Sequence, residues 1–402
     1  MKDKLSIKPN SMNVLTINSG SSSIKFALYS SDGSWERILN GKVDRIGITD
    51  TCLHFNNLKK NKKGNLKIEV SDHKSVAKFL IDWLEKQVDF SSINAIGHRV
   101  VYGMQHSIPE LITSGLLKEL SLITSYDLDH LPAEIELIKV FRQHYPKLTQ
   151  IACFDTAFHQ TMPRVATLLP IPRRFDTKGI QRYGFHGLSY SYLMEELTRI
   201  EGHEAAQGRI ILAHLDHGAS MAAVYKGKSI DTSMGFTPVG GLMMGTRSGD
   251  LDPVVAWFIM KSEKLSPKQF NMLINHESGL IGISVTSSDM QDLLESQKTD
   301  FRAAEAVELF CYQAKKWIGA FAAVLGGLET LVFSGGMGEN APEIRSRICK
   351  GLGFLGIEID EKQNKTNEQV ILRNNGKTTV RGIHTDEEWM IVKTVSQMIH
   401  SI

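Results

Sequence analysis

The sequence predicts an α/β protein built from two related halves. Strand-like apolar runs alternate with amphipathic helical patterns along the 402 residues, which is typical of this fold class. The chain is long for a single hydrophobic core, so two domains are expected. A strand, a polar turn and a second strand at residues 14–29 have a counterpart from residue 210 onward. Such self-similarity indicates duplicated topology, although two unrelated hairpins would also resemble each other.

Each expected element follows from its local periodicity. Short apolar runs rich in β-branched and aromatic residues predict strands at residues 14–18, 25–29, 95–101, 151–154, 209–214, 222–225 and 330–333. Apolar residues three and four positions apart predict helices at residues 75–87, 133–143, 189–199, 252–261, 267–275, 301–326 and 387–399. Three glycines in "FSGGMGEN" predict a strand-to-helix turn, with the helix beginning near Pro342.

Composition and charge argue against several classes of protein. The net charge is +2, which gives no electrostatic footprint for nucleic acid. The lysines of "NNLKKNKKGNLK" are expected at a solvated hairpin tip. The four cysteines are far apart and form no C-x-x-C, which favours reduced thiols over disulfides or zinc. The start has no apolar signal-peptide region, and the longest uncharged apolar run, residues 317–328, is too short for a membrane span. We therefore expect a soluble, cytoplasmic protein.

Three small-residue turns have the chemistry of a phosphate site. In "INSGSSSIKFALY" hydroxyls and backbone N–H groups crowd a turn beside Lys25, which suits an anion. "HLDHGAS" from His214 is the matching turn of the second half, and "FSGGMGEN" offers glycines before a helix N-terminus. Two such turns could hold one polyphosphate from both sides. A serine-rich polar hairpin remains the alternative interpretation of the first turn.

Two arginines, a histidine and an aspartate stand out as candidate functional residues. Arg247 lies in the Gly/Met loop "GLMMGTRSGDLDP", where it suits a carboxylate or phosphate ligand or, alternatively, caps local carbonyls or pairs with Asp250. Arg99 follows a short apolar strand, and Asp155 ends another. His186 lies in the Gly-flanked aromatic turn "RYGFHGLSY", where a structural role is the alternative.

These motifs together resemble those of the acetate kinases, within the acetate and sugar kinase/Hsp70/actin superfamily. The resemblance covers about residues 14–390 and is carried by Asn18 with "GSSSIK", and by "GHRVV", "FDTAFH", "YGFHG", "GFTP…GLMMGTRSGDLDP", "FSGGMGEN" and "TDEE". It implies two actin-like (ribonuclease H-like) domains of duplicated topology around a central cleft. The first would comprise residues 1–155, with a C-terminal helix at 389–402 returning to it. The second, residues 156–388, would carry the adenosine site.

The resemblance implies reversible transfer of the ATP γ-phosphoryl group to acetate, with Mg²⁺ as cofactor and a homodimer as the usual assembly. The acceptor carboxylate is already ionised at neutral pH, so the reaction needs positioning and charge neutralisation rather than a strong base. Neither nucleic acid nor a membrane is an expected partner. The alternatives are a kinase for propionate, butyrate or another short-chain carboxylate, one using another phosphate donor, or a non-catalytic nucleotide-binding relative.

The resemblance also implies roles for individual residues. Asp155, His186 and Arg247 would be catalytic, with Arg247 and His186 stabilising the phosphoryl group in transfer and Asp155 positioning the metal or the arginines. The substrate-binding residues would be Arg99, which holds the carboxylate, and Val101 and Pro238, which line the acyl pocket. The metal-supporting residues would be Asn18 and Glu387. The ATP-binding residues would be Lys25, Ser21, Ser23, His214, Leu215, Asp216, His217, Gly218, Asp289, Met290, Gln291, Gly336, Met337, Gly338, Glu339 and Asn340.

The second phosphate turn departs from the family pattern. Asp216-His217 stands where the family has Gly-Asn, and Tyr102 stands where it usually has His. The stretch 129–132, Asp-His-Leu-Pro, corresponds to the family's Leu-His-Asn-Pro. An aspartate beside the phosphates would repel them. We therefore expect Asp216 to raise the pKa of His217, so that the protonated imidazole donates to phosphate.

Overall fold

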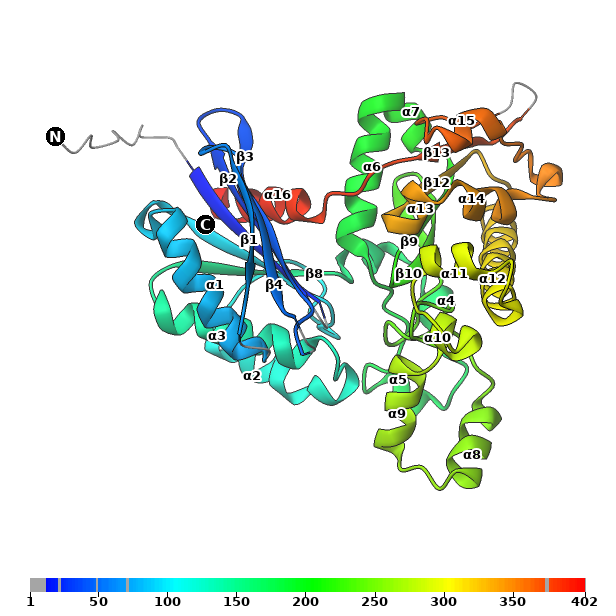
Figure 1. The fold of residues 1–402 in the computed structure, drawn as a ribbon, viewed down its shortest axis with the longest axis horizontal. Helices are drawn as coiled ribbons and strands as arrows, with labels where there is room; N and C mark the ends of the chain where they lie inside the picture. Colours follow the sequence, from blue (N-terminus) through cyan, green and yellow to red (C-terminus); the bar gives the residue numbers. More distant parts are fainter. Residues whose placement is uncertain (1–11, 21–22, 48–49, 70–71, 373–375, 402) are drawn as a thin grey trace. The chain divides into compact units, whose positions relative to one another are not determined.

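The computed structural model describes residues 12–20, 23–47, 50–69, 72–372 and 376–401. The chain divides into two compact units, each with its own sheet (Figure 1). Unit 1 comprises residues 1–157 and 386–402, and unit 2 comprises residues 158–385. The sequence-based domain boundaries were 155/156 and 388/389.

Unit 1 is built on a sheet with the strand order β5-β4-β3-β2-β1-β6-β8-β7. Strands β1 to β5 pair antiparallel in succession, β1, β6 and β8 are parallel, and β7 is antiparallel to β8. The bounds are β1 (Met12–Ser19), β2 (Ile24–Ser31), β3 (Trp35–Asp44), β4 (Cys52–Asn57), β5 (Lys62–Lys67), β6 (Ala95–Val100), β7 (Glu110–Leu111) and β8 (Thr149–Phe154). Because β1, β6 and β8 run the same way, their carboxyl ends meet at one edge of the sheet.

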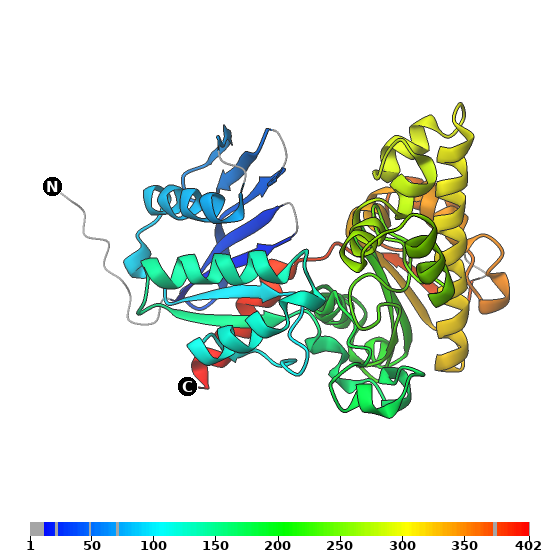
Figure 2. The same cartoon turned by 90° about the horizontal axis from the view of Figure 1, so that it is seen from below.

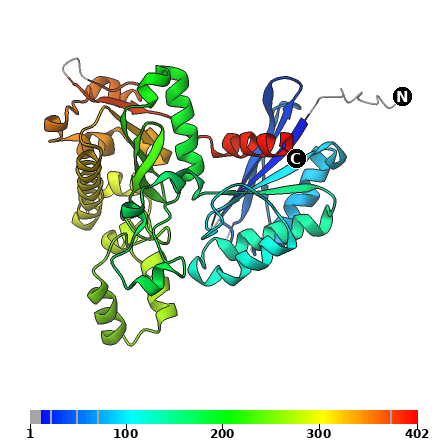
Figure 3. The ribbon, with the colours of Figure 1, turned by 180° about the vertical axis from the view of Figure 1, so that it is seen from behind.

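Helices cover both faces of this sheet. The helices are α1 (His73–Gln87), α2 (Ser114–Leu122), α3 (Leu131–His144) and α16 (Glu387–His400), with single turns η1 (Phe90–Ser92) and η2 (Thr124–Tyr126). Helices α1 and α3 bury their apolar sides against one face, in a core that includes Phe26, Leu80 and Phe141. Helix α16 packs on β1 and β6, close enough that a Cβ on Gly97 would lie 2.3 Å from Ile391 Cγ2 (Figure 3). Gly97 therefore permits the close helix–strand contact.

Unit 2 is built on a smaller sheet with the strand order β11-β10-β9-β12-β13. Strands β9, β10 and β11 are antiparallel neighbours, and β9, β12 and β13 are parallel. The bounds are β9 (Arg209–Leu215), β10 (Ala219–Tyr225), β11 (Lys228–Thr232), β12 (Thr330–Ser334) and β13 (Thr379–Gly382). The order β3-β2-β1-β6-β8 in unit 1 has the same connectivity and strand directions. The two sheets therefore repeat one topology.

Two helices flank the second sheet. Helix α6 packs its apolar side on β9, β10 and β12, and the long helix α12 runs along β9 to β11 (Figure 2). The helices of unit 2 are α4 (Arg164–Thr167), α5 (Arg173–Asp176), α6 (Gly187–Glu201), α7 (His203–Ala206), α8 (Pro253–Ser262), α9 (Pro267–His276), α10 (Gly279–Ser284), α11 (Met290–Ser296), α12 (Phe301–Leu325), α13 (Gly335–Asn340), α14 (Pro342–Cys349) and α15 (Glu361–Lys365). The single turns are η3 (Ala157–Thr161), which crosses the boundary, and η4 (Gly353–Leu355).

One sequence-based expectation about local structure was wrong, although helix α14 does begin at Pro342 as predicted. The glycines of "FSGGMGEN" form helix α13 directly after β12, rather than a turn. Gly335 makes this possible, because it has φ +77° and a Cβ there would lie 2.7 Å from the Leu215 carbonyl oxygen. The lysine-rich segment forms the expected solvated hairpin: Lys59 and Lys60 lie in the turn between β4 and β5, Lys62, Lys63 and Lys67 lie on β5, and all five are exposed.

Candidate functional site

In unit 1 the polar residues predicted at strand ends meet at one edge of the sheet. Asn18 is near the end of β1, Arg99 is on β6, and Asp155 follows β8. Arg99 Nη2 lies 2.7 Å from Asp155 Oδ2, and Arg99 Nη1 donates to Asn18 Oδ1 at 3.1 Å. The Asp155 side chain is fully buried, and that of Arg99 is 13% exposed. The Asp155 carboxylate therefore holds the Arg99 guanidinium in place, and only a small part of the arginine side chain is accessible to solvent.

The first turn of α16 completes this group. Asn18 Nδ2 donates to Glu387 Oε2 at 2.8 Å and to Glu388 Oε1 at 3.1 Å. Burial on its own lowers the pKa of Arg99, but the carboxylates of Asp155 and Glu387 outweigh that effect and raise it. The arginine thus stays charged while facing buried acids. The contact between Asn18 and Glu387 could not be predicted from local sequence, because the two residues are 369 positions apart.

Glu134 is a buried acid that the sequence analysis missed. It is 2% exposed, and both carboxyl oxygens lie 3.1–3.2 Å from the Val101 backbone N–H. Burial raises the pKa of Glu134 well above its ordinary value, and the nearby Asp127 raises it further. A glutamate in the first turn of a helix is common, so nothing in the sequence marked Glu134 as a partner of the Val101 N–H.

In unit 2 His186 is held rigidly at the start of α6. Its φ of +60° is left-handed, which is unusual for a residue other than glycine and is typical of functional positions. Its Nδ1 lies 2.7 Å from Ser220 Oγ, and its ring lies 4.4 Å, centroid to centroid, from that of His214. His214 in turn contacts Ser189 Oγ at 2.8 Å. Ser220, two positions after Gly218, is a supporting residue that the sequence analysis did not single out.

His186 and Arg247 converge on the second phosphate turn. A Cβ built on Gly218 would lie 3.4 Å from His186 Nε2 and 3.7 Å from Arg247 Nη1. Arg247 Nη1 also donates to the Pro238 carbonyl at 3.1 Å, while Asp250 accepts the Gly241 N–H at 2.8 Å. The arginine therefore does bond a local carbonyl, yet its guanidinium also faces the turn. An imidazole and a guanidinium beside Gly218, which has no side chain, are suited to an anion.

The expected behaviour of His217 is contradicted. Its pKa is lowered, not raised: burial has the largest effect, Arg247 lowers it further, and Asp216 and Asp289 do not compensate. Asp216 Oδ1 instead accepts the backbone N–H of His217 at 2.8 Å. The Asp216 carboxylate also lies 3.1 Å from where a Cβ of Gly336 would be. Asp216 therefore faces the beginning of α13 rather than pairing with the His217 ring.

The remaining predicted ATP-binding residues lie around these elements. Glu339 of α13 accepts the Gly335 N–H at 2.9 Å and contacts His384 Nδ1 at 2.6 Å. Asp289 caps α11 by accepting the Gln291 N–H at 2.7 Å. Leu215 ends β9, Met290 begins α11, and Met337, Gly338 and Asn340 belong to α13.

The predicted residues of the first turn lie in unit 1. Lys25 is the register partner of Asn18 in the β1–β2 pair. The carbonyl of Ser23 accepts the Gly20 N–H at 2.7 Å, and Ser21 lies outside the described residues. Of the two predicted acyl-pocket residues, Val101 belongs to unit 1 and Pro238 to unit 2. That pocket stays a prediction.

Comparison with known proteins identifies the family. The family model described as the acetokinase family matches residues 13–393. The chain belongs to the acetokinase family. Acetokinase family members are kinases that transfer a phosphoryl group from ATP to a carboxyl acceptor, and the expected enzyme class is thus confirmed.

Sequence and structural relatives agree with this family. An acetate kinase of Thermoanaerobacterium thermosaccharolyticum is 42% identical, over 97% of this chain and 100% of the relative. A crystal structure of Porphyromonas gingivalis acetate kinase matches with a TM-score of 0.84 and 35% identity, over 96% of this chain and 100% of that one. A propionate kinase from Francisella tularensis matches with a TM-score of 0.88 and 36% identity, over 95% and 98% of the two chains. The predicted α/β fold with two actin-like domains is confirmed.

Proposed function

We propose that this chain transfers the γ-phosphoryl group of ATP to acetate, reversibly, giving acetyl phosphate and ADP. The observation that carries the proposal is the approach of His186 Nε2 and Arg247 Nη1 to the Gly218 turn. An anion bound at this turn would receive two donors, one of them permanently charged. These groups suit a phosphoryl group whose charge spreads over its oxygens during transfer.

Arg99 is the proposed ligand of the acetate carboxylate. Its guanidinium is held by Asp155 and Asn18, so little rotational freedom is lost when a carboxylate binds. Acetate is ionised at neutral pH and needs no base. We therefore assign Asp155 the role of orienting Arg99 rather than of moving a proton.

Asn18 and Glu387 are the proposed support for Mg²⁺. Their amide and carboxylate oxygens are hard ligands of the kind Mg²⁺ prefers. Within the described ranges no group of three or more His, Cys, Asp or Glu residues is placed to hold a metal. That fits Mg²⁺ in a kinase, where phosphates and water supply most ligands. The ion would neutralise phosphate charge.

Within unit 2 the nucleotide is proposed to contact the turn at residues 214–218, helix α13 and Asp289. Within unit 1, Lys25 is a proposed phosphate ligand. Glycines 218 and 336 leave room for phosphate and backbone to approach. The Asp216 carboxylate beside Gly336 is the unfavourable element of this arrangement, and its charge would weaken ATP binding.

Propionate is the second candidate acceptor, because the propionate kinase named above matches as well as the acetate kinase structure. An acyl-phosphate assay that traps the product as hydroxamate separates the two. With ATP, Mg²⁺ and equal concentrations of acetate, propionate and butyrate, we expect the largest kcat/KM for acetate. A higher value for propionate would reassign the substrate. No product with any acceptor, from protein that binds ATP, would indicate a non-catalytic relative.

We further propose a cytoplasmic homodimer. No helix in the described part of the chain is long and apolar enough to cross a membrane. Helix α8 exposes a cluster of large apolar side chains, including Trp257 at 59% and Phe258 at 62%. Apolar side chains gathered on one surface helix favour contact with another protein surface, and a second copy of this chain is the proposed occupant.

A further inference from the structure

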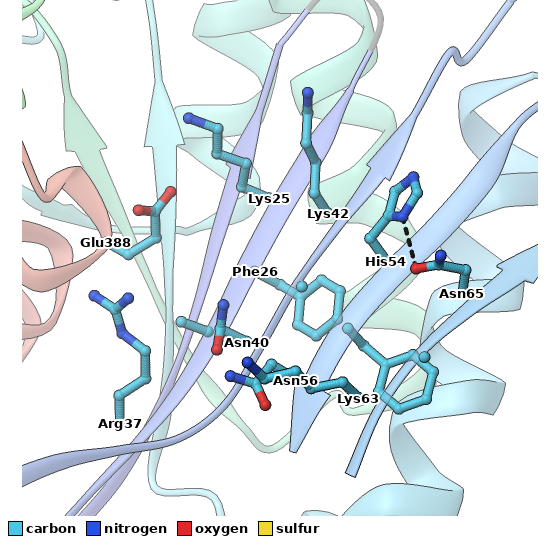
Figure 4. Close-up of a pocket in the computed structure, with 14 residues that line it drawn as sticks. Lys25, Phe26, Arg37, Asn40, Lys42, His54, Asn56, Lys63, Asn65 and Glu388 are labelled. Carbon is cyan, nitrogen blue, oxygen red and sulfur yellow. Dashed lines mark hydrogen bonds between the residues drawn. The ribbon is translucent and has the colours of Figure 1, made fainter. Parts of the chain in front are cut away.

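A hollow lined by polar side chains and by Phe26 and Phe55 lies on strands β2 to β5 in unit 1 (Figure 4). Strand register places Lys25, Lys42, His54 and Asn65 in one row across the four strands. The next row contains Ala27, Asn40, Asn56 and Lys63. Side chains of one row project from the same face, so the hollow is lined by cations and amides. Its volume is about 410 Å³, a size typical of sites for small molecules.

Arg37 adds a preorganised cation at the edge of this hollow. Its Nε donates to the Tyr29 hydroxyl at 2.7 Å, and its guanidinium pairs with Asp386. Lys42 pairs with Asp44 at 2.9 Å, but that pair is about 40% exposed and therefore weak. A bound anion could therefore replace Asp44 as the partner of Lys42 with little loss of free energy from the broken ion pair.

One carboxylate lines the hollow, that of Glu388. Its Oε1 accepts from Asn18 Nδ2 at 3.1 Å. Against it stand the cationic residues Lys25, Arg37, Lys42 and Lys63. Asp386 and Asp44 pair with Arg37 and Lys42, so four cations face three carboxylates and the excess of positive charge around the hollow is small.

We propose that this hollow binds a small phosphorylated metabolite that carries hydroxyl groups. A phosphate dianion satisfies several cations at once, which a single carboxylate does not. The amides of Asn40, Asn56 and Asn65 can both donate and accept, so they suit hydroxyl groups beyond the phosphate. The occupant is distinct from the nucleotide, because most of the lining comes from β3, β4 and β5.

Occupancy would also alter nucleotide use, a consequence that rests on the proposed function. Lys25 lines the hollow and is the proposed phosphate ligand of unit 1, and Glu388 follows the proposed metal-supporting Glu387. A phosphate held by Lys25 from the hollow would compete with ATP for that ammonium. The expected effect is a higher KM for ATP with little change in KM for acetate.

Titration calorimetry of the full chain with fructose 1,6-bisphosphate, without ATP or acetate, tests the binding independently of kinase activity. The variant Lys42→Ala/Lys63→Ala removes two lining cations. The variant Lys59→Ala/Lys62→Ala removes two lysines of the same hairpin that do not line the hollow. We expect the first to weaken binding about tenfold or more, and the second to leave Kd within about twofold.

Three other outcomes would overturn the proposed binding site. Absence of heat at millimolar ligand would mean that no such site exists. Equal binding by both variants would place the ligand elsewhere, such as at the nucleotide site. Succinate binding as tightly as the bisphosphate would exclude a phosphate site. If binding behaves as expected but KM for ATP is unchanged by the ligand, the site stands and its link to the proposed nucleotide role fails.

Discussion

Arg99 and Arg247 are held by different kinds of partner. Arg99 is fixed by the buried carboxylate of Asp155, whereas Arg247 donates to the neutral carbonyl of Pro238. A charged partner offsets part of the guanidinium's charge, and a carbonyl offsets much less. The roles proposed for the two residues differ accordingly: Arg99 is proposed to bind the ground-state carboxylate, and Arg247 to stabilise charge that develops during transfer.

Replacement of Arg247 by alanine tests that distinction. We expect kcat to fall by about 10²-fold or more, with KM for acetate changed by less than about threefold, because the lost interaction acts mainly in the transition state. Steady-state kinetics with the Arg173→Ala control, whose arginine side chain is 78% exposed, gives the comparison. A near-normal kcat would remove Arg247 from the mechanism.

Asp216 and His217 are the residues at which this chain departs most from the family pattern near the proposed phosphates. Two unit charges about 4 Å apart repel by roughly 1 kcal/mol in water, which is about fivefold in affinity. We therefore expect Asp216→Gly/His217→Asn to bind ATP about fivefold more tightly, by equilibrium binding. Much weaker binding by a correctly folded double variant would indicate instead that Asp216 supports the metal.

The lowered pKa of His217 gives a separate pH prediction. An imidazole whose pKa lies below its ordinary value of about 6.5 is neutral at pH 7 and above. The kcat/KM for ATP of His217→Asn should therefore parallel that of the unmodified chain from about pH 7 to 8.5. If kcat/KM for ATP falls over that range in the unmodified chain but not in His217→Asn, His217 is protonated near pH 7.

At the scale of elements, the parallel pair β6–β8 buries a histidine in unit 1. His98 is 2% exposed, its Nε2 lies 2.8 Å from Gln150 Oε1, and burial lowers its pKa to about 4. The unfolded chain therefore binds the proton more readily than the folded chain. Stability associated with His98 is present above about pH 6.5 and is lost as the pH falls toward 4.

His98→Gln tests this contribution. Between pH 7 and pH 5 the unmodified chain should lose roughly 2 kcal/mol of unfolding free energy through His98, and the variant should lose that much less. Urea unfolding at the two pH values, with exposed His54→Gln as the control, measures the difference. An identical pH dependence in His98→Gln would show that the buried ring does not govern acid stability.

At the scale of the whole molecule, the exposed apolar side chains of α8 bear on assembly. Trp257→Glu/Phe258→Glu should convert a dimer to a monomer in sedimentation velocity, because charges would replace buried aromatic contacts. Phe354→Glu, at another exposed phenylalanine, is the matched control and should remain dimeric. A dimer in the α8 variant would place the interface elsewhere.

The elements were predictable because their signals are local. Short apolar runs located the strands that carry Asn18 and Arg99 and the strand that Asp155 follows, and chain length indicated two domains. Local signals failed at α13, because residues 335–340, expected as a turn, form a short helix before the predicted helix that begins at Pro342. Glu134 was missed for a related reason: its partner, the Val101 N–H, is 33 positions away.

The sequence by itself determined the fold class, the duplicated strand–turn–strand pattern and the residue types from which a phosphoryl-transfer site is built, since these follow from periodicity and side-chain chemistry. The tertiary structure alone decided which residues meet and in what electrostatic surroundings. Asn18 donates to Glu387, which lies 369 positions away in the sequence. The pKa of His217 is lowered by desolvation and by Arg247, and its neighbour Asp216 does not reverse that shift. Desolvation and Coulomb interactions depend on distances in space, and neighbours in the sequence do not specify those distances.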